Sequence, residues 1–276
     1  MDEAIRTAPY LHCCDHTGLR MLDVSIALLP AVAGALWFFG WQAALVLLAA
    51  LAGCLAAEWG CGRLLHRGDL RDGSAAVTGL LLGLLLPPGC PWWAALAGGA
   101  AAAAVKGLSG GLGRNPVNPA ALARVLLLAL PALRPAPMRM AEGNFLMAYL
   151  GGSLGETSTL LLLAGAVYLM IRRLIPLRIT GPALAAVFLT GLCIPGCDPL
   201  AVAAWGGSLL AAAFLAADPV TSPMNGILQI LYGLGTGVLC TLAAYYGFGI
   251  AGTCCGILAV NLLGRLAELL LRRWSR

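Results

Sequence analysis

The chain is a succession of apolar runs, separated by short segments that hold most of its charged residues. Most of these runs are long enough to cross the hydrocarbon core of a bilayer, which takes about 20 residues of α-helix. Hydrophobic residues make up 60% of the sequence and charged residues only 11%, against about 25% charged residues in a soluble domain. Since a chain in lipid must satisfy its own backbone hydrogen bonds, this pattern predicts an all-α integral membrane protein.

Charged residues and Pro or Gly breaks divide the apolar pattern into about ten predicted transmembrane helices within a single polytopic membrane domain, residues 1–276. Residues 1–18 lack the apolar core and cleavage site of a signal peptide, so we expect a short cytoplasmic N-terminal tail. The third and seventh predicted helices are short for a full span. The predicted helices cover residues 19–39, 43–65, 74–86, 91–107, 119–133, 156–171, 179–194, 200–217, 226–248 and 250–271.

The basic residues predict the orientation of these helices. The chain carries 17 Lys and Arg against 12 Asp and Glu. The basic residues are scattered at the ends of predicted helices without forming a basic face. We therefore expect them to set the membrane topology and to contact lipid headgroups, and not to bind nucleic acid. With the N-terminus inside, all of them except Arg124, Arg134 and Arg139 fall in cytoplasmic segments. The bias predicts a multi-pass protein with both termini cytoplasmic.

Two stretches of the sequence resemble each other. Residues 84–99 read LLLPPGCPWWAALAGG and residues 192–207 read LCIPGCDPLAVAAWGG. Each is followed by an Asn/Asp-Pro-Val loop, at residues 114–119 and 217–223. Chance similarity of Ala/Gly-rich helices and an internal duplication both account for this echo. Under duplication, a ligand site is expected where short or broken helices of two repeats meet.

Polar stretches at the ends of predicted helices need an explanation, because irregular backbone at membrane depth persists only inside protein or around a cavity. The Gly-rich loop 110–119 allows close backbone approach, and Asn115 and Asn118 offer donors and acceptors that suit the edge of a flat heterocycle. The same loop also suits a helix entry, with Asn118 as the cap and Pro119 at the first helical position.

Three acidic or hydroxyl side chains at other helix ends also allow two interpretations, a ligand contact or a purely structural role. Asp218 and Thr221 fit a turn, and Glu156 fits the first turn of a helix. An acid at a membrane boundary is nevertheless a candidate site residue.

Several chemistries find no support in the sequence. It contains no nucleophile–base pattern, phosphate-cradling loop or dinucleotide fingerprint, and its three histidines lie outside the predicted helices. None of the ten cysteines shows the two-residue spacing of common zinc or iron–sulfur clips. We therefore predict no catalytic residue and no metal site formed by this chain alone.

The motifs do resemble a known family, over nearly the whole chain and in order. The similarity lies in residues 8–12 (APYLH), 36–40 (LWFFG), 72–82 (DGSAAVTGLLL), 110–119 (GGLGRNPVNP), 152–158 (GSLGETS) and 218–221 (DPVT). These segments resemble the D subunit of the Rnf electron-transport complex, which is related to the B subunit of the sodium-pumping quinone reductase.

The resemblance implies a bundle of ten helices in pseudo-repeated halves, as in urea transporters. It also implies a function as a membrane subunit of an ion-translocating ferredoxin:NAD oxidoreductase, in which electrons pass through bound flavin to drive Na+ or H+ transport. The expected partners are other Rnf-type subunits, in the cell membrane of a bacterium or archaeon. Oxidoreductase activity would then belong to the assembly, because one subunit holds only part of the chain of redox centres.

The family resemblance also implies cofactor-binding residues. Family members hold riboflavin non-covalently in a region that corresponds best to the loop of Asn115 and Asn118. The full candidate set joins this loop to the other matching segments: Gly111, Gly113, Asn115, Asn118, Ser74, Thr78, Glu156, Thr157, Asp218 and Thr221.

The chain departs from the family at the covalent flavin site. Family members attach FMN to a Thr in an outer loop, within a motif that reads roughly Asp-Gly-x-Ser-x-Ala-Thr. Here the corresponding loop, residues 134–153, contains no Thr. We therefore predict riboflavin or FMN bound without a covalent bond. The missing motif leaves two alternatives: a small-solute channel or transporter of the same fold, and a scaffold subunit without cofactors.

Overall fold

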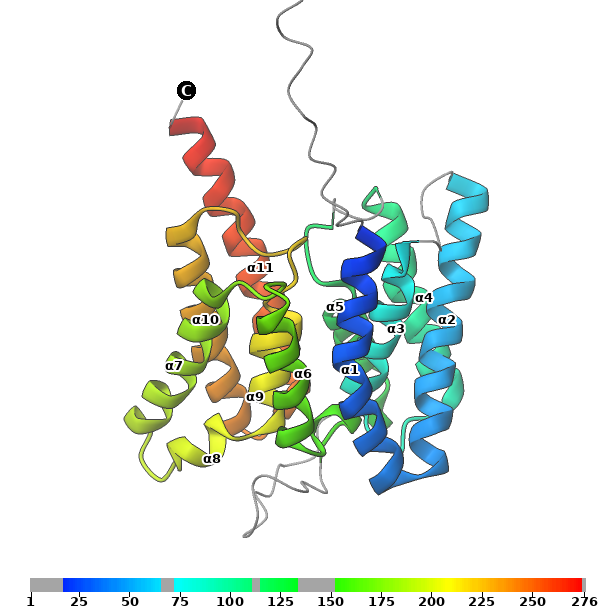
Figure 1. Cartoon of the computed structure of the whole chain (residues 1–276), viewed down its shortest axis with the longest axis horizontal. Helices are drawn as coiled ribbons and strands as arrows, with labels where there is room; N and C mark the ends of the chain where they lie inside the picture. The colour runs from blue at the N-terminus through cyan, green and yellow to red at the C-terminus, as the bar shows by residue number, and fades with distance from the viewer. Residues whose placement is uncertain (1–16, 66–71, 111–114, 134–151, 275–276) are drawn as a thin grey trace, which may run out of the picture.

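The computed structural model describes residues 17–65, 72–110, 115–133 and 152–274 (Figure 1). These residues form eleven α-helices, and no β-strand occurs among them. Four helices, α1, α2, α10 and α11, are long and apolar enough to cross a membrane, and five shorter apolar helical segments accompany them. The prediction of an all-α, multi-pass membrane protein is confirmed.

The helices divide into two halves in chain order. The first half contains α1 (Thr17–Phe39), α2 (Trp41–Leu65), α3 (Ser74–Leu85), α4 (Trp92–Leu108) and α5 (Pro119–Leu126), followed by the 3₁₀ turns η2 (Leu127–Ala129) and η3 (Pro131–Leu133). The second half contains the 3₁₀ turn η4 (Leu154–Glu156), α6 (Thr159–Ile171), α7 (Leu177–Cys193), α8 (Pro199–Ala203), α9 (Gly206–Leu210), the π-helix η5 (Ala211–Leu215), α10 (Gly226–Tyr245) and α11 (Gly249–Trp274).

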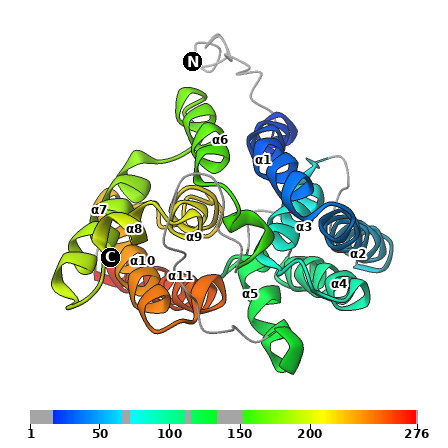
Figure 2. The same ribbon diagram turned by 90° about the horizontal axis from the view of Figure 1, so that it is seen from below.

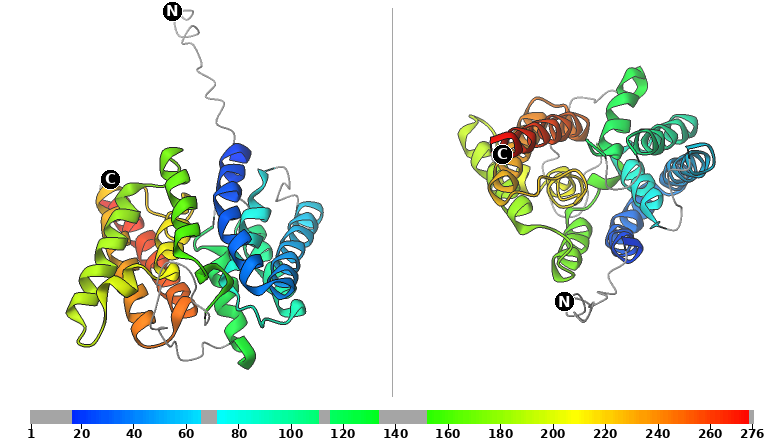
Figure 3. Two further views of the ribbon diagram at one scale, coloured as in Figure 1. Left: turned by 60° about the horizontal axis from the view of Figure 1, so that its bottom comes forward. Right: turned by 90° about the horizontal axis from the view of Figure 1, so that it is seen from above.

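The two halves lie side by side and have corresponding outer helix pairs (Figure 2). In the first half α2 packs along α4, and in the second half α7 packs along α10. The halves meet where α1 packs on α6 and where α5 packs on α11. Seen along the bundle, α3 and α9 occupy the centre of this arrangement (Figure 3).

Corresponding helices of the two halves run in opposite directions. Helix α1 begins at the end of the bundle where α6 ends, and α11 finishes at that same end (Figure 1). The described chain therefore starts and stops on one side of the bundle, which we call the terminal side. The arrangement is that of two inverted repeats, in which the first half supplies the short helix α3 to the centre and the second half supplies the interrupted segment of α8 and α9.

Glycine at the helix crossings explains how the outer pairs pack so closely. A Cβ atom added at Gly99 of α4 would lie 2.2 Å from the carbonyl oxygen of Ala50 in α2. In the second half, a Cβ atom at Gly237 of α10 would lie 2.2 Å from the carbonyl oxygen of Ala183 in α7. Small residues at such contacts let two backbones approach within a membrane, where burial of apolar surface contributes little.

Two predicted helices are not continuous. The segment 119–133 stops at Leu126 and continues as 3₁₀ turns, since Leu130 adopts an extended conformation before Pro131. The segment 200–217 splits because Trp205 is extended (φ −66°, ψ 130°) between α8 and α9. The helix predicted from residue 156 begins at Thr159, and Glu156 lies instead in the turn η4.

The sequence echo does not follow the structural repeat. Residues 84–99 join α3 to α4, whereas residues 192–207 join α7 to α8 and α9. By position in the two halves, α3 corresponds to α8 and α9, and α4 corresponds to α10. The echoing stretches thus occupy different places in the repeat, which favours chance similarity.

Candidate functional site

A cavity of about 420 Å³ lies between the two halves, toward the terminal side of the bundle. Its volume is within the range of small-molecule sites, about 300–1,000 Å³. The first half contributes α1, α3, the end of α4 and the entry to α5, and the second half contributes the end of α6, η5 and the loop after η5. Five of the ten predicted site residues line it: Ser74, Thr78, Asn115, Asn118 and Asp218.

Asn115 is the residue whose surroundings most clearly point to a ligand. Its side chain lines the cavity and is 3% exposed. Its Oδ1 atom is buried and has no hydrogen-bond partner among the described residues. A buried acceptor left unpaired costs about 1–3 kcal/mol, so such atoms are rare without a function. A ligand N–H or O–H in the cavity would satisfy it.

Asn118 joins the two halves of the bundle. Its Oδ1 accepts hydrogen bonds from the backbone N–H groups of Ala120 and Ala121, at 3.0 and 3.1 Å, which caps α5. Its Nδ2 donates to the carbonyl oxygen of Leu215, at the end of η5 in the other half. The helix-cap interpretation is confirmed. One Nδ2 proton remains for a ligand, so a ligand contact from Asn118 stays a prediction.

The π-helix η5 forms part of the cavity wall and presents the carbonyl group that Asn118 binds. Its wider turn is closed by the N–H of Ala216, which donates to the carbonyl oxygen of Ala211 at 2.8 Å. Isolated π-turns of this kind occur often at functional sites.

Ser74 and Thr78 bring polar atoms to the cavity at the start of α3. The Ser74 backbone N–H and its hydroxyl both donate to Asp72 Oδ1, at 2.8 and 2.5 Å. The Thr78 hydroxyl donates to the carbonyl oxygen of Ser74 at 2.9 Å. Because the Thr78 hydroxyl proton is already donated to Ser74, the Thr78 oxygen can only accept a hydrogen bond from a ligand.

Asp218 and Thr221 form a turn after η5. The Asp218 carboxylate accepts hydrogen bonds from the backbone N–H of Val220, at 3.1 Å, and from the Thr221 hydroxyl, at 3.2 Å. The turn interpretation is confirmed, and Asp218 also lines the cavity. Burial of the carboxyl group raises the pKa of Asp218, and its two hydrogen bonds oppose that shift.

The remaining predicted residues lie elsewhere. Glu156 and Thr157 are buried at η4 and do not line the cavity. Glu156 accepts hydrogen bonds from Ser153 Oγ, at 3.1 Å, and from Trp205 Nε1, at 3.3 Å. Gly111 and Gly113 lie outside the described residues. The predicted set therefore forms one group at the cavity and a second group at η4.

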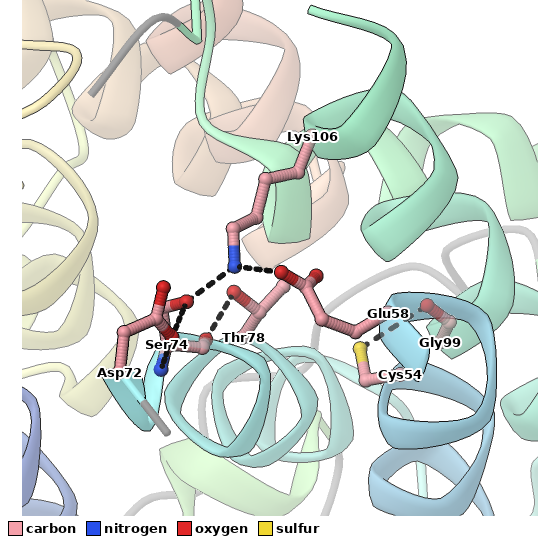
Figure 4. Close-up of polar contacts among 7 residues, drawn as sticks. All are labelled: Cys54, Glu58, Asp72, Ser74, Thr78, Gly99 and Lys106. Atoms are coloured by element: carbon pink, nitrogen blue, oxygen red, sulfur yellow. Dashed lines mark hydrogen bonds and ion pairs between the residues drawn. The ribbon is translucent and has the colours of Figure 1, made fainter. Parts of the chain in front are cut away.

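The buried cation of this cavity was not predicted from the sequence. Lys106, assigned to the cytoplasmic side by charge bias, is 2% exposed and reaches between α2 and α3 (Figure 4). Its Nζ atom lies 2.8 Å from Glu58 Oε1 and donates to Ser74 Oγ. Two sequence features could have pointed to Lys106: it is the only lysine in the sequence, and it ends an apolar run.

Fold and cavity together define a class: a multi-pass helical membrane protein of two inverted halves, with a partly polar cavity between them. The chain belongs to the NQR2, RnfD, RnfE family, which matches its residues 4–140 and 135–273. These two matches cover nearly all of the chain, in agreement with the family resemblance of its motifs.

Three relatives illustrate the similarity. The D subunit of the ion-translocating oxidoreductase complex of Stutzerimonas stutzeri is 33% identical, over 90% of this chain and 88% of its own. The D subunit of the Na(+)-translocating ferredoxin:NAD(+) oxidoreductase complex of Acetobacterium woodii is 34% identical, over 96% of this chain and 92% of its own. The D subunit of the proton-translocating ferredoxin:NAD(+) oxidoreductase complex of Clostridium ljungdahlii is 29% identical, over 96% and 93%.

The relatives carry residues that this chain lacks. The alignment with the Acetobacterium woodii protein extends over 294 positions, more than the 276 residues of the chain. The two family matches meet at residues 135–140, within the segment 134–153 that contains no Thr and lies largely outside the described residues.

Proposed function

We propose that this chain is the D-type membrane subunit of an Rnf ion-translocating ferredoxin:NAD+ oxidoreductase complex, and that it binds riboflavin or FMN non-covalently in the cavity between its halves. The names and long matches of its relatives support the assignment to such a complex. One relative is named for Na+ and another for protons, so we propose Na+ or H+ as the transported ion.

The unpaired Oδ1 atom of Asn115 is the observation that carries the flavin proposal. A flavin ring presents N–H and C=O groups along one edge, and the Asn115 oxygen would accept from such an N–H. The free Nδ2 proton of Asn118 and the Thr78 oxygen add one donor and one acceptor nearby. Apolar side chains from both halves, including Leu81 and Phe214, would cover the faces of a flat ring and exclude water.

When bound, a flavin supplies transfer of one or two electrons, which the side chains of this chain do not. The protein contributes binding, orientation and electrostatics. Because residues 134–153 contain no Thr, we propose that the cavity holds the flavin without a covalent bond.

We also propose that the terminal side of the bundle faces the cytoplasm. The N-terminal start of α1 and the C-terminal end of α11 lie on this side, and so does the cavity. Arg20, Arg172 and Arg173 surround the cavity there, in accord with the positive-inside rule. Partner subunits of the complex would then exchange electrons with the cavity from the cytoplasmic side of the cell membrane.

Flavin analysis of the purified chain tests this function. Acid denaturation should release riboflavin or FMN in about one equivalent, and the intact mass of the polypeptide should be unmodified. Flavin that stays attached after denaturation would refute the non-covalent assignment. A folded but colourless protein would refute the flavin proposal and favour a scaffold or a solute pathway.

A further inference from the structure

The cavity holds an ion pair that the proposed function does not yet use. Lys106, from the last turn of α4, lines the cavity, whereas its partner Glu58 on α2 is absent from the lining. Both side chains are 2% exposed, and the Nζ–Oε1 distance is 2.8 Å. The ammonium group lies between Ser74, which also lines the cavity, and Glu58, which does not (Figure 4).

The surroundings hold the ammonium group in place. Lys106 Nζ donates to Glu58 Oε1 and to Ser74 Oγ, and the Ser74 hydroxyl in turn donates to Asp72 Oδ1. An ammonium group has three protons, so one has no acceptor among the residues that the structure describes. Glu58 Oε2 is buried and has no hydrogen-bond partner among the described residues. The pair is thus incompletely satisfied on both sides.

Stability alone does not explain such a pair. Removing two charges from water is so unfavourable that apolar side chains of similar size often replace a buried ion pair without loss of stability. Ionisable residues within the membrane are accordingly candidates for function. Here Lys106 and Asn115, whose Oδ1 atom has no partner among the described residues, line the same cavity.

The other cations at the cavity are in a different environment. Arg20, Arg172 and Arg173 are exposed, and Arg172 already forms an ion pair with Asp23 at 2.8 Å. Solvent weakens the field of an exposed charge, whereas a charge in a low-dielectric interior acts strongly over several ångströms. Among the described lining residues, Lys106 is therefore the cation best placed to act on a ligand.

We propose that the Lys106 ammonium group stabilises the negative charge that the cavity ligand gains on reduction, and that Glu58 and Ser74 position it. This inference rests on the proposed flavin function. A ligand that accepts one electron from a reduced iron–sulfur protein, without a proton, gains one negative charge; the charge leaves with that electron when the ligand is reoxidised. The ammonium group keeps its protons throughout. Lys106 thus raises the reduction potential of the bound flavin.

An anaerobic redox titration of the bound flavin with dithionite tests the proposal. Lys106→Met leaves the Glu58 carboxylate uncompensated, so the midpoint potential should fall. The double variant Glu58→Gln/Lys106→Met removes both charges and leaves no unpaired buried ion. Its midpoint should lie between those of the wild type and Lys106→Met. Arg63→Met, which removes an exposed cation at the end of α2, is the matched control and should leave the midpoint unchanged.

The outcomes separate this proposal from the flavin function itself. A double variant that binds flavin fully and keeps the wild-type midpoint would overturn the role of Lys106, even if Lys106→Met fails to fold. An equal fall in Arg63→Met would also overturn it, since the effect would then reflect net charge alone. A folded wild-type chain without flavin would instead refute the proposed function.

Discussion

Replacing Asn115 by Leu should weaken flavin binding while stabilising the empty protein. In the free chain the Asn115 Oδ1 atom is buried without a partner among the described residues, which costs about 1–3 kcal/mol. Leucine of similar size removes that unpaired acceptor. In the flavin-bound protein, however, the same substitution leaves a buried flavin N–H without an acceptor, at a similar cost of about 1–3 kcal/mol.

The expected loss of affinity is therefore roughly 5- to 150-fold, since 1.4 kcal/mol corresponds to tenfold in Kd. Two measurements are needed. Equilibrium titration of flavin-depleted protein in detergent gives the affinity from flavin fluorescence, and thermal unfolding of the same preparation gives the stability. A loss of flavin affinity together with a gain in thermal stability identifies a ligand contact, whereas damage to the fold would lower both.

Asn261 offers a matched control. It is also a fully buried asparagine, and its Nδ2 atom has no hydrogen-bond partner in the part of the chain that the structure describes, but it lies on α11 and does not line the cavity. Asn261→Leu removes the acceptor of the Tyr232 hydroxyl, so it should lower stability and leave flavin affinity unchanged. Wild-type flavin affinity in Asn115→Leu, or equal losses in both variants, would refute the reasoning.

Three further predictions concern the helix framework and the covalent state of the chain. Asn118→Ala removes the cap of α5 and the link to Leu215, so it should lower stability by about 1–2 kcal/mol in thermal unfolding. Gly99→Ala should lower stability by about 1–3 kcal/mol, because its Cβ atom would contact Ala50, whereas Gly181→Ala meets no neighbour and should be tolerated. The intact mass of the chain should equal that of the polypeptide, because residues 134–153 contain no Thr to which a flavin could be attached.

Local sequence signals were sufficient to predict most helices and the segments that carry the site. Apolar length, Pro and Gly breaks and charge bias located eight of the ten predicted helices as single observed helices. The Asn118 cap with Pro119 after it is a local pattern, and it begins α5 as expected. The polar stretch of Ser74 and Thr78 likewise begins α3 and reaches the cavity.

The helix break at Trp205 was not predictable in this way. The split at Trp205 accompanies a hydrogen bond from its indole to Glu156, 49 residues away. Glu156 itself was expected at the flavin site with the loop of Asn115 and Asn118, because its motif matches the family. The structure places it at η4, and it does not line the cavity. Periodicity and composition contain no information about which of several buried polar groups will meet.

The sequence by itself determined the class of protein, because a chain this apolar and this poor in charge can satisfy its backbone only as membrane helices. It also determined the polar segments from which a site could be built. Only the tertiary structure decided which side chains share the cavity. Lys106 and Glu58 lie 48 residues apart and on different helices, and Asn118 meets Leu215 across the two halves. The first pair forms only when α4 packs on α2, and the second only when the two halves pack together, since neither helix alone specifies its partner.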